Sequence, residues 1–276
     1  MAEAGQRIRA CVLRDARSVQ MRWQDADPID MTIARNCRPV ATLGMLALLL
    51  SGQVSCAQDP AEAEYFTALR GEETGMGRAK QLAHVERAIA LQPGRAWYWE
   101  THAIYSIDVQ DYETAAADLN EAVRLADRPY LRHLRGLVAC QRGRYESSLE
   151  DFDRAIAGQP KNTQFYRGRS LARSKVGRFE DALADARKLV EMVPQQGETW
   201  YALGEALTGL GRYGEAIHAY DESLRRRPEL IYPLRGRAEA YRRMGDASRA
   251  ESDLGEAARR ERDESTYAVS LDPFRY

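Results

Sequence analysis

The sequence has little lysine, little histidine and almost no excess of either charge. Four of its 276 residues are lysine, four are histidine, and the formal net charge is −1. Proteins that bind nucleic acid or an anionic membrane through their overall field carry a clear basic excess, so neither partner is predicted. With 44% hydrophobic and 29% charged residues, the chain is also too polar for a protein with several membrane spans.

The residue groupings that build most catalytic and metal sites are absent as well. The cysteines form no CxxC pair, the histidines form no HExxH pattern, and no phosphate loop of the GxxxxGK(S/T) type occurs. We therefore predict that the chain is not an enzyme and has no cofactor and no metal site. The residues concerned are Cys11, Cys37, Cys56, Cys140, His84, His102, His133 and His218.

Residues 31–57 have the layout of a secretory signal. Arg35 and Arg38 precede an apolar run at 40–50, and small residues follow. This run is well short of the roughly 20 residues that a membrane-spanning helix needs. We therefore expect an exported protein, located in the periplasm or on a periplasm-facing membrane. The alternative is that the run is a buried helix of a globular domain.

Two processing routes fit the end of this segment. Residues 55–57 follow the small-x-small pattern of an ordinary signal peptidase site, which would leave Gln58 as the new N-terminus. Residues 54–56 instead resemble a bacterial lipobox, in which Cys56 is acylated, although Gln53 stands where an aliphatic residue is usual. Both routes stay open, so membrane contact is expected only through an N-terminal lipid anchor on Cys56.

Residues 1–30 fit neither route. They carry five arginines and five acidic residues without a clear pattern, and a signal does not normally begin so far into a chain. We expect residues 1–30 to be a non-native extension, with Met31 as the true start. The alternative is a disordered cytoplasmic extension and no export.

After residue 57 the sequence repeats with a period of 34 residues. Glycine, proline and an aromatic residue each recur at this interval, which is the mark of a repeat architecture. Glycine ends a helix in the left-handed conformation, and proline stops the next one, so each period predicts two helices. The members of the three columns are Gly143, Gly177, Gly211, Gly245, Pro160, Pro194, Pro228, Tyr145, Phe179 and Tyr213.

The best period resembles the tetratricopeptide repeat family. Its signature residues are Trp200, Leu203, Gly204, Ala216, Tyr220 and Pro228, with Leu207 in place of the usual tyrosine. The resemblance implies an all-α fold, a right-handed α-solenoid of stacked helix-turn-helix repeats. We assign five clear repeats and one divergent N-terminal repeat to residues 58–264, followed by a tail at 265–276.

The resemblance further implies that the first helix of each repeat lines a concave groove that binds a protein or peptide partner. Tyr201 and Glu205 fall on the groove side of their helix, and the period carries both positions along the array. Ile104, Leu137 and Leu171 are either partner contacts or packing between repeats. The predicted groove residues are Trp97, Glu100, Ile104, Tyr130, His133, Leu137, Arg167, Leu171, Tyr201, Glu205, Arg235 and Glu239.

Family members that capture a C-terminal carboxylate use lysine, arginine and asparagine in the groove. Asn36, Asn120 and Asn162 do not fall on the groove columns, so that clamp is not predicted. The sequence favours a non-enzymatic protein–protein interaction scaffold of the bacterial cell envelope. A cytoplasmic co-chaperone or regulatory adaptor, and an accessory to an enzyme elsewhere, remain the alternatives.

Overall fold

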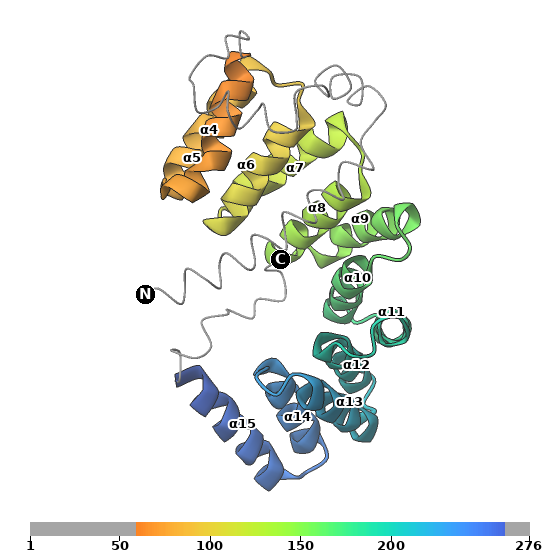
Figure 1. Cartoon of the computed structure of the whole chain (residues 1–276). Helices are drawn as coiled ribbons and strands as arrows, with labels where there is room; N and C mark the ends of the chain where they lie inside the picture. The colour runs from red at the N-terminus through yellow and green to blue at the C-terminus, as the bar shows by residue number, and fades with distance from the viewer. Residues whose placement is uncertain (1–58, 263–276) are drawn as a thin grey trace, which may run out of the picture. The chain divides into compact units, whose positions relative to one another are not determined.

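The computed structural model describes residues 59–262, which form twelve α-helices and no strand (Figure 1). The predicted signal, the lipidation at Cys56 and the tail at 265–276 lie outside the described residues. The helices are α4 (Pro60–Thr74), α5 (Arg78–Leu91), α6 (Ala96–Asp108), α7 (Tyr112–Leu125), α8 (Pro129–Gln141), α9 (Tyr145–Gly158), α10 (Thr163–Lys175), α11 (Phe179–Met192), α12 (Gly197–Gly209), α13 (Tyr213–Arg226), α14 (Tyr232–Arg243) and α15 (Ala247–Arg262).

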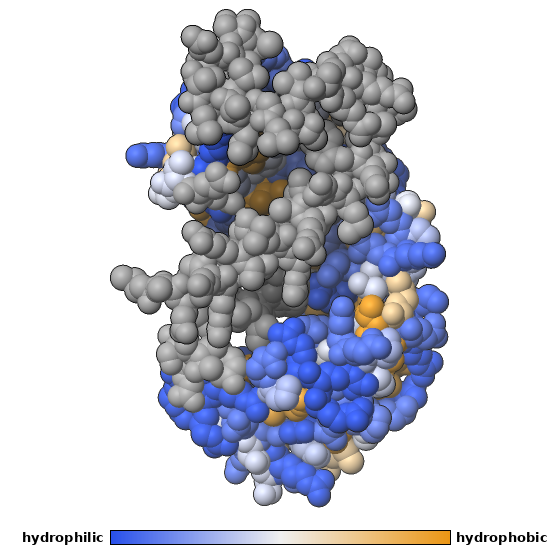
Figure 2. All heavy atoms as spheres, in the orientation of Figure 1, coloured by the Kyte–Doolittle hydropathy of each residue, from blue (hydrophilic) through white to orange (hydrophobic). Residues whose placement is uncertain are grey.

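Consecutive helices pack as six hairpins, α4 with α5 through α14 with α15, and each hairpin packs on the next. The predicted all-α solenoid is therefore confirmed. No helix among residues 59–262 is long and apolar enough to cross a membrane. The surface of these helices is mostly hydrophilic, with scattered hydrophobic spots (Figure 2).

The predicted helix ends are confirmed at the recurring glycines. Gly143, Gly177, Gly211 and Gly245 have φ between 71° and 84°, the left-handed region that glycine enters without a side-chain penalty. In the turn between α6 and α7, Gln110 takes the same place with φ 62°. The turn geometry is thus kept even where the glycine is missing.

The hairpins pack through a matched alternation of large and small residues. Phe152 on α9 is fully buried and lies against Gly136 on α8 and Gly168 on α10. Tyr220 on α13 is placed in the same way against Gly204 and Gly236. A methyl group added at any of these glycines would lie within 3.0 Å of the ring. Glycine is therefore required where the second helix carries an aromatic residue.

The intervening hairpin has the opposite pattern. One period after Phe152 the residue is Ala186, and the flanking positions are Ser170 and Ala202 instead of two glycines. Ala186 is fully buried, and Ser170 and Ala202 are buried beside it. Side-chain volume is thus exchanged between facing helices, which keeps the interior close-packed.

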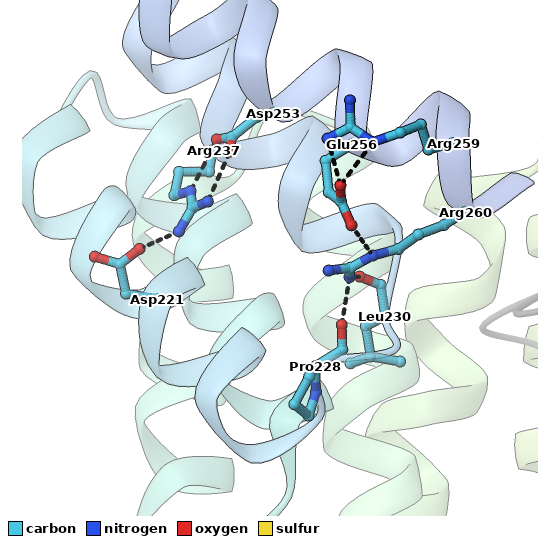
Figure 3. Close-up of polar contacts among 8 residues, drawn as sticks. All are labelled: Asp221, Pro228, Leu230, Arg237, Asp253, Glu256, Arg259 and Arg260. Carbon is cyan, nitrogen blue, oxygen red and sulfur yellow. Dashed lines mark hydrogen bonds and ion pairs between the residues drawn. The ribbon is translucent and has the colours of Figure 1, made fainter.

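The loops between hairpins are held by hydrogen bonds to the proline carbonyls. The indole nitrogens of Trp99 and Trp200 donate to the carbonyl oxygens of Pro93 and Pro194, both at 2.8 Å. The Tyr166 hydroxyl donates to Pro160 in the same way at 3.1 Å. In the last hairpin the guanidinium of Arg260 takes this role and donates to the carbonyl of Pro228 (Figure 3).

In three hairpins an arginine also links the hairpin to the one before it. Arg169 on α10 donates two hydrogen bonds to Asp185 of its own hairpin, at 2.9 and 2.6 Å, and one to Asp153 of the preceding hairpin, at 2.6 Å. Arg237 joins Asp253 and Asp221 in the same geometry (Figure 3). We call Arg135, Arg169 and Arg237, with the acidic residues that they bind, the arginine ladder.

Two of the other hairpins have a different residue at the position of the ladder arginine. His102 replaces arginine in α6 and contacts Asp118 at 2.7 Å. Burial opposes the charged imidazole, but the hydrogen bond and charge of Asp118 outweigh it and raise the pKa of His102. In α12 the position is Leu203, and the aspartate is replaced by Ala219. An apolar pair thus occupies the same place in the fold in this hairpin.

Candidate functional site

A cavity of about 420 Å³ opens among the first helices of four adjacent hairpins. α8, α10, α12 and α14 adjoin one another along one side of the array, because α10 packs directly on α8 and α12, and α12 on α14. The cavity is lined by Tyr130, His133, Leu134, Leu137, Tyr145, Asn162, Gln164, Phe165, Arg167, Gly168, Ser170, Leu171, Lys175, Glu198, Tyr201, Ala202, Glu205 and Tyr232.

The two ends of this cavity differ in chemistry. α8 contributes Tyr130, Leu134 and Leu137, which form an apolar wall. α12 contributes the two acidic residues of the lining, Glu198 and Glu205. A cavity of this size with few polar groups on apolar walls is typical of a ligand-binding site.

The α12 wall is centred on Glu205 and Tyr201. Burial raises the pKa of the Glu205 carboxyl, although a hydrogen bond from Tyr201 and the positive charge of Lys175 lower it in part. Burial and the Glu205 charge together hold the pKa of Tyr201 well above its usual range. The Tyr201 ring contacts Tyr232 edge to face, with 4.3 Å between ring centroids. This wall therefore presents a poorly solvated carboxylate beside aromatic rings.

The α8 wall carries a neutral histidine. His133 is 8% exposed, and its ring lies 4.9 Å from that of Phe165. Burial, with the nearby charge of Arg167, lowers the pKa of His133 to about 3. The imidazole is consequently uncharged near neutral pH and acts as part of the aromatic surface.

Seven of the predicted groove residues line the cavity, and five do not. Glu100 is bound to Arg128 at 2.5 Å, and Ile104 packs against the core of the first two hairpins. Arg235 pairs with Glu261 at 2.5 Å. Trp97 packs on the same N-terminal core, and Glu239 is held by Arg242 and Arg243. The residues at the cavity are Tyr130, His133, Leu137, Arg167, Leu171, Tyr201 and Glu205.

A further column of lining residues is not among those predicted from the sequence. Trp97 and Tyr130 are predicted groove residues. The same period continues to Gln164, Glu198 and Tyr232, all three of which line the cavity. Extending the 34-residue period from Tyr130 would have identified them. The column is hard to recognise in the sequence because its residues change from aromatic (Tyr130) to polar (Gln164 and Glu198) and back to aromatic (Tyr232).

Asn162 also lines the cavity, although we placed no asparagine on the groove columns. It precedes α10, and its side-chain oxygen accepts a hydrogen bond from the backbone nitrogen of Gln164 at 3.1 Å. Asn162 is therefore a helix cap that reaches the edge of the cavity.

Cys140 lies in the core and not in the cavity. Its side chain is 2% exposed and donates to the Ser148 hydroxyl at 3.3 Å. Burial raises the pKa of the thiol to about 11, which leaves it protonated and unreactive near neutral pH. Among residues 59–262 no cluster of three metal-ligating side chains occurs.

Comparison with known proteins identifies the repeats. Residues 101–164 and 167–231 match the tetratricopeptide repeat model. The human Tetratricopeptide repeat protein 28 is 28% identical over 102 residues, which are 37% of this chain but 4% of that protein. The segments that match this model span the hairpins from α6 to α13, and the chain spans a small part of this longer relative.

Solved structures show the same fold at low identity. A tetratricopeptide repeat protein from Parabacteroides merdae has a TM-score of 0.66 and 15% identity, over 73% of this chain and 80% of that one. PilW, a type IV pilus biogenesis factor, has a TM-score of 0.62 and 18% identity, over 76% and 95%. YrrB, a TPR protein with an unusual peptide-binding site, has 0.57 and 16%, over 64% and 91%.

Proposed function

We propose that this chain is a non-enzymatic protein–protein interaction scaffold that binds a peptide or helix of its partner in the cavity described above. The observation that carries this proposal is the cavity itself, which lies where the first helices of four hairpins adjoin and combines an apolar wall with a polar one. Apolar anchors with a few placed polar groups are the usual means by which grooves bind peptides. YrrB has a peptide-binding site on the same fold.

Replacing Leu171 with aspartate tests the groove. Leu171 is partly exposed and lines the cavity, so the new charge would face the bound peptide. We expect the affinity for peptides selected from a random octapeptide library to fall about tenfold or more, since one apolar anchor contributes at least 1–2 kcal/mol. Fluorescence anisotropy with labelled peptides measures the change, and circular dichroism checks the helices.

Leu254→Asp is the matched control, because Leu254 is 49% exposed on α15 and does not line the cavity. Leu137 is a poorer choice, since it also packs against the core formed by Cys140, Leu149 and Phe152. Equal binding by the Leu171→Asp protein and the wild type would contradict the groove proposal, as would the absence of any peptide that binds the wild type.

We further propose that the scaffold works in the bacterial cell envelope. The support is the signal-like layout of residues 31–57. Mass spectrometry of the N-terminus after expression in a Gram-negative host is the test. An acylated Cys56 is expected for a lipoprotein, and a free Gln58 for a soluble periplasmic protein. An uncleaved chain would contradict export and favour the cytoplasmic adaptor.

A further inference from the structure

We propose that the cavity recognises a single lysine or arginine side chain flanked by apolar residues in the partner peptide, with Glu205 as its ionic partner. This inference rests on the proposed function and specifies the chemistry of the partner. It is argued from the surroundings of Glu205, from the ion pairs made by comparable acidic residues, and from the walls on either side.

Glu205 lines the cavity without an ion pair inside the described part of the chain, although the positive charge of Lys175 acts on it from a distance. Within residues 59–262, no lysine, arginine or histidine lies within ion-pair distance of its carboxylate, and Tyr201 is its hydrogen-bond donor. Glu198, the other acidic residue of the lining, is bound to Arg227. One period further on, Glu239 is bound to Arg242 and Arg243.

A cation would relieve the energetic cost of the Glu205 charge. Burial raises the pKa of this carboxyl, which means that its ionised form is poorly solvated in the empty cavity. An arriving ammonium or guanidinium group replaces the missing solvation through a charge-assisted hydrogen bond. Tyr201 is hydrogen-bonded to the carboxylate and its ring contacts that of Tyr232, and aromatic faces attract cations.

The other walls restrict what can accompany this cation. Leu137 and Leu171 line the cavity and are partly exposed, so they offer apolar surface to a neighbouring aliphatic or aromatic side chain. Arg167 and Lys175 also line the cavity and repel a second basic residue. A volume of about 420 Å³ holds only a few side chains. One basic residue flanked by apolar ones therefore fits better than a basic run or an acidic peptide.

The test uses an array of acetylated, amidated octapeptides, in which each sequence occurs with arginine, glutamine or glutamate at a central position. Binding of the full chain is compared with that of the Glu205→Gln variant. For the wild type we expect the arginine peptides to bind about tenfold more tightly than their glutamine counterparts. In the Glu205→Gln variant the affinities for the arginine and glutamine peptides should become equal to within about twofold.

Glu180→Gln serves as the control, since Glu180 is exposed on α11 and is not part of the cavity lining. It should keep the full preference for arginine. Thermal unfolding followed by circular dichroism confirms that both variants are folded.

The outcomes separate this inference from the proposed function. Peptides that bind without a basic preference, or a preference that survives in Glu205→Gln, would overturn the role of Glu205 and leave the groove intact. A wild-type chain that binds no octapeptide would overturn both. Loss of the preference in Glu205→Gln alone, with Glu180→Gln unchanged, would support the inference.

Discussion

Replacing Asp185 with alanine is expected to lower the free energy of unfolding by about 3–5 kcal/mol, the usual cost of leaving a buried charge without its partner. The Asp185 side chain is 5% exposed and binds Arg169 and Arg173, whose side chains are 15% and 19% exposed. The alanine variant would leave two guanidinium groups in a poorly solvated site. Urea unfolding followed by circular dichroism measures the loss, and the slope of the transition reports whether it stays cooperative.

Asp153→Ala is the matched control for this effect. Asp153 binds the same guanidinium of Arg169 at 2.6 Å, but its side chain is 55% exposed. Exposed ion pairs contribute about 0–1 kcal/mol, so this variant should remain close to the wild type. If Asp153→Ala and Asp185→Ala cost the same, burial would not be what gives the arginine ladder its effect.

The next hairpin supplies a rescue. One period after Arg169, Arg173 and Asp185, the residues are Leu203, Leu207 and Ala219. Installing that apolar set, as Arg169→Leu, Arg173→Leu and Asp185→Ala together, should restore most of the stability lost in Asp185→Ala. Buried ion pairs can often be replaced by packed apolar groups at little cost. A triple variant no more stable than Asp185→Ala would show that the two solutions are not interchangeable.

The 34-residue period was sufficient to predict the class of fold. A glycine at each helix end and a proline two residues after α9, α11 and α13 place the turns by local backbone chemistry, which does not depend on distant contacts. Gln110 is an exception, because the turn forms there without glycine. Its geometry is imposed by the packing of α6 and α7 and not by a local preference.

The arginine ladder was harder to predict, because its partners lie 16 residues away on both sides. The period shows that Arg135, Arg169 and Arg237 are equivalent, but not that each points toward two neighbouring helices. An arginine on a helix is usually solvated, so its pattern alone gives no sign of burial. The ion pairs of the arginine ladder become evident only in the structure, where consecutive hairpins pack on each other.

The candidate site was predictable as a set of columns but not as a cavity. Residues at equivalent positions of different hairpins have different partners. Glu239 forms ion pairs with arginines, and Glu205 does not. Whether a lining residue borders empty space depends on the volumes of its neighbours in three helices. Those volumes are set by pairs such as Phe152 with Gly168, which a single-residue pattern does not reveal.

Gly168→Ala is expected to destabilise the protein by about 1–3 kcal/mol, the usual cost of overpacking a core. A Cβ atom at this position would lie 2.6 Å from the ring of Phe152, whose side chain is fully buried and cannot withdraw. Helix propensity alone would predict the opposite, since alanine is favoured over glycine in a helix by about 1 kcal/mol. Urea unfolding decides between the two effects.

The sign of Gly168→Ala should reverse once the ring is removed. Phe152→Ala by itself is expected to cost about 3–5 kcal/mol through the cavity that it leaves. In that background the added methyl group does not contact the Phe152 ring. Positions 152 and 168 would then both hold alanine, as the equivalent positions of the next hairpin do with Ala186 and Ala202. Gly168→Ala should then stabilise the protein by about 0.5–1 kcal/mol. If Gly168→Ala destabilises both backgrounds equally, contact with Phe152 is not the reason for glycine at this position. The matched side-chain volumes of facing helices would then not determine how these repeats pack.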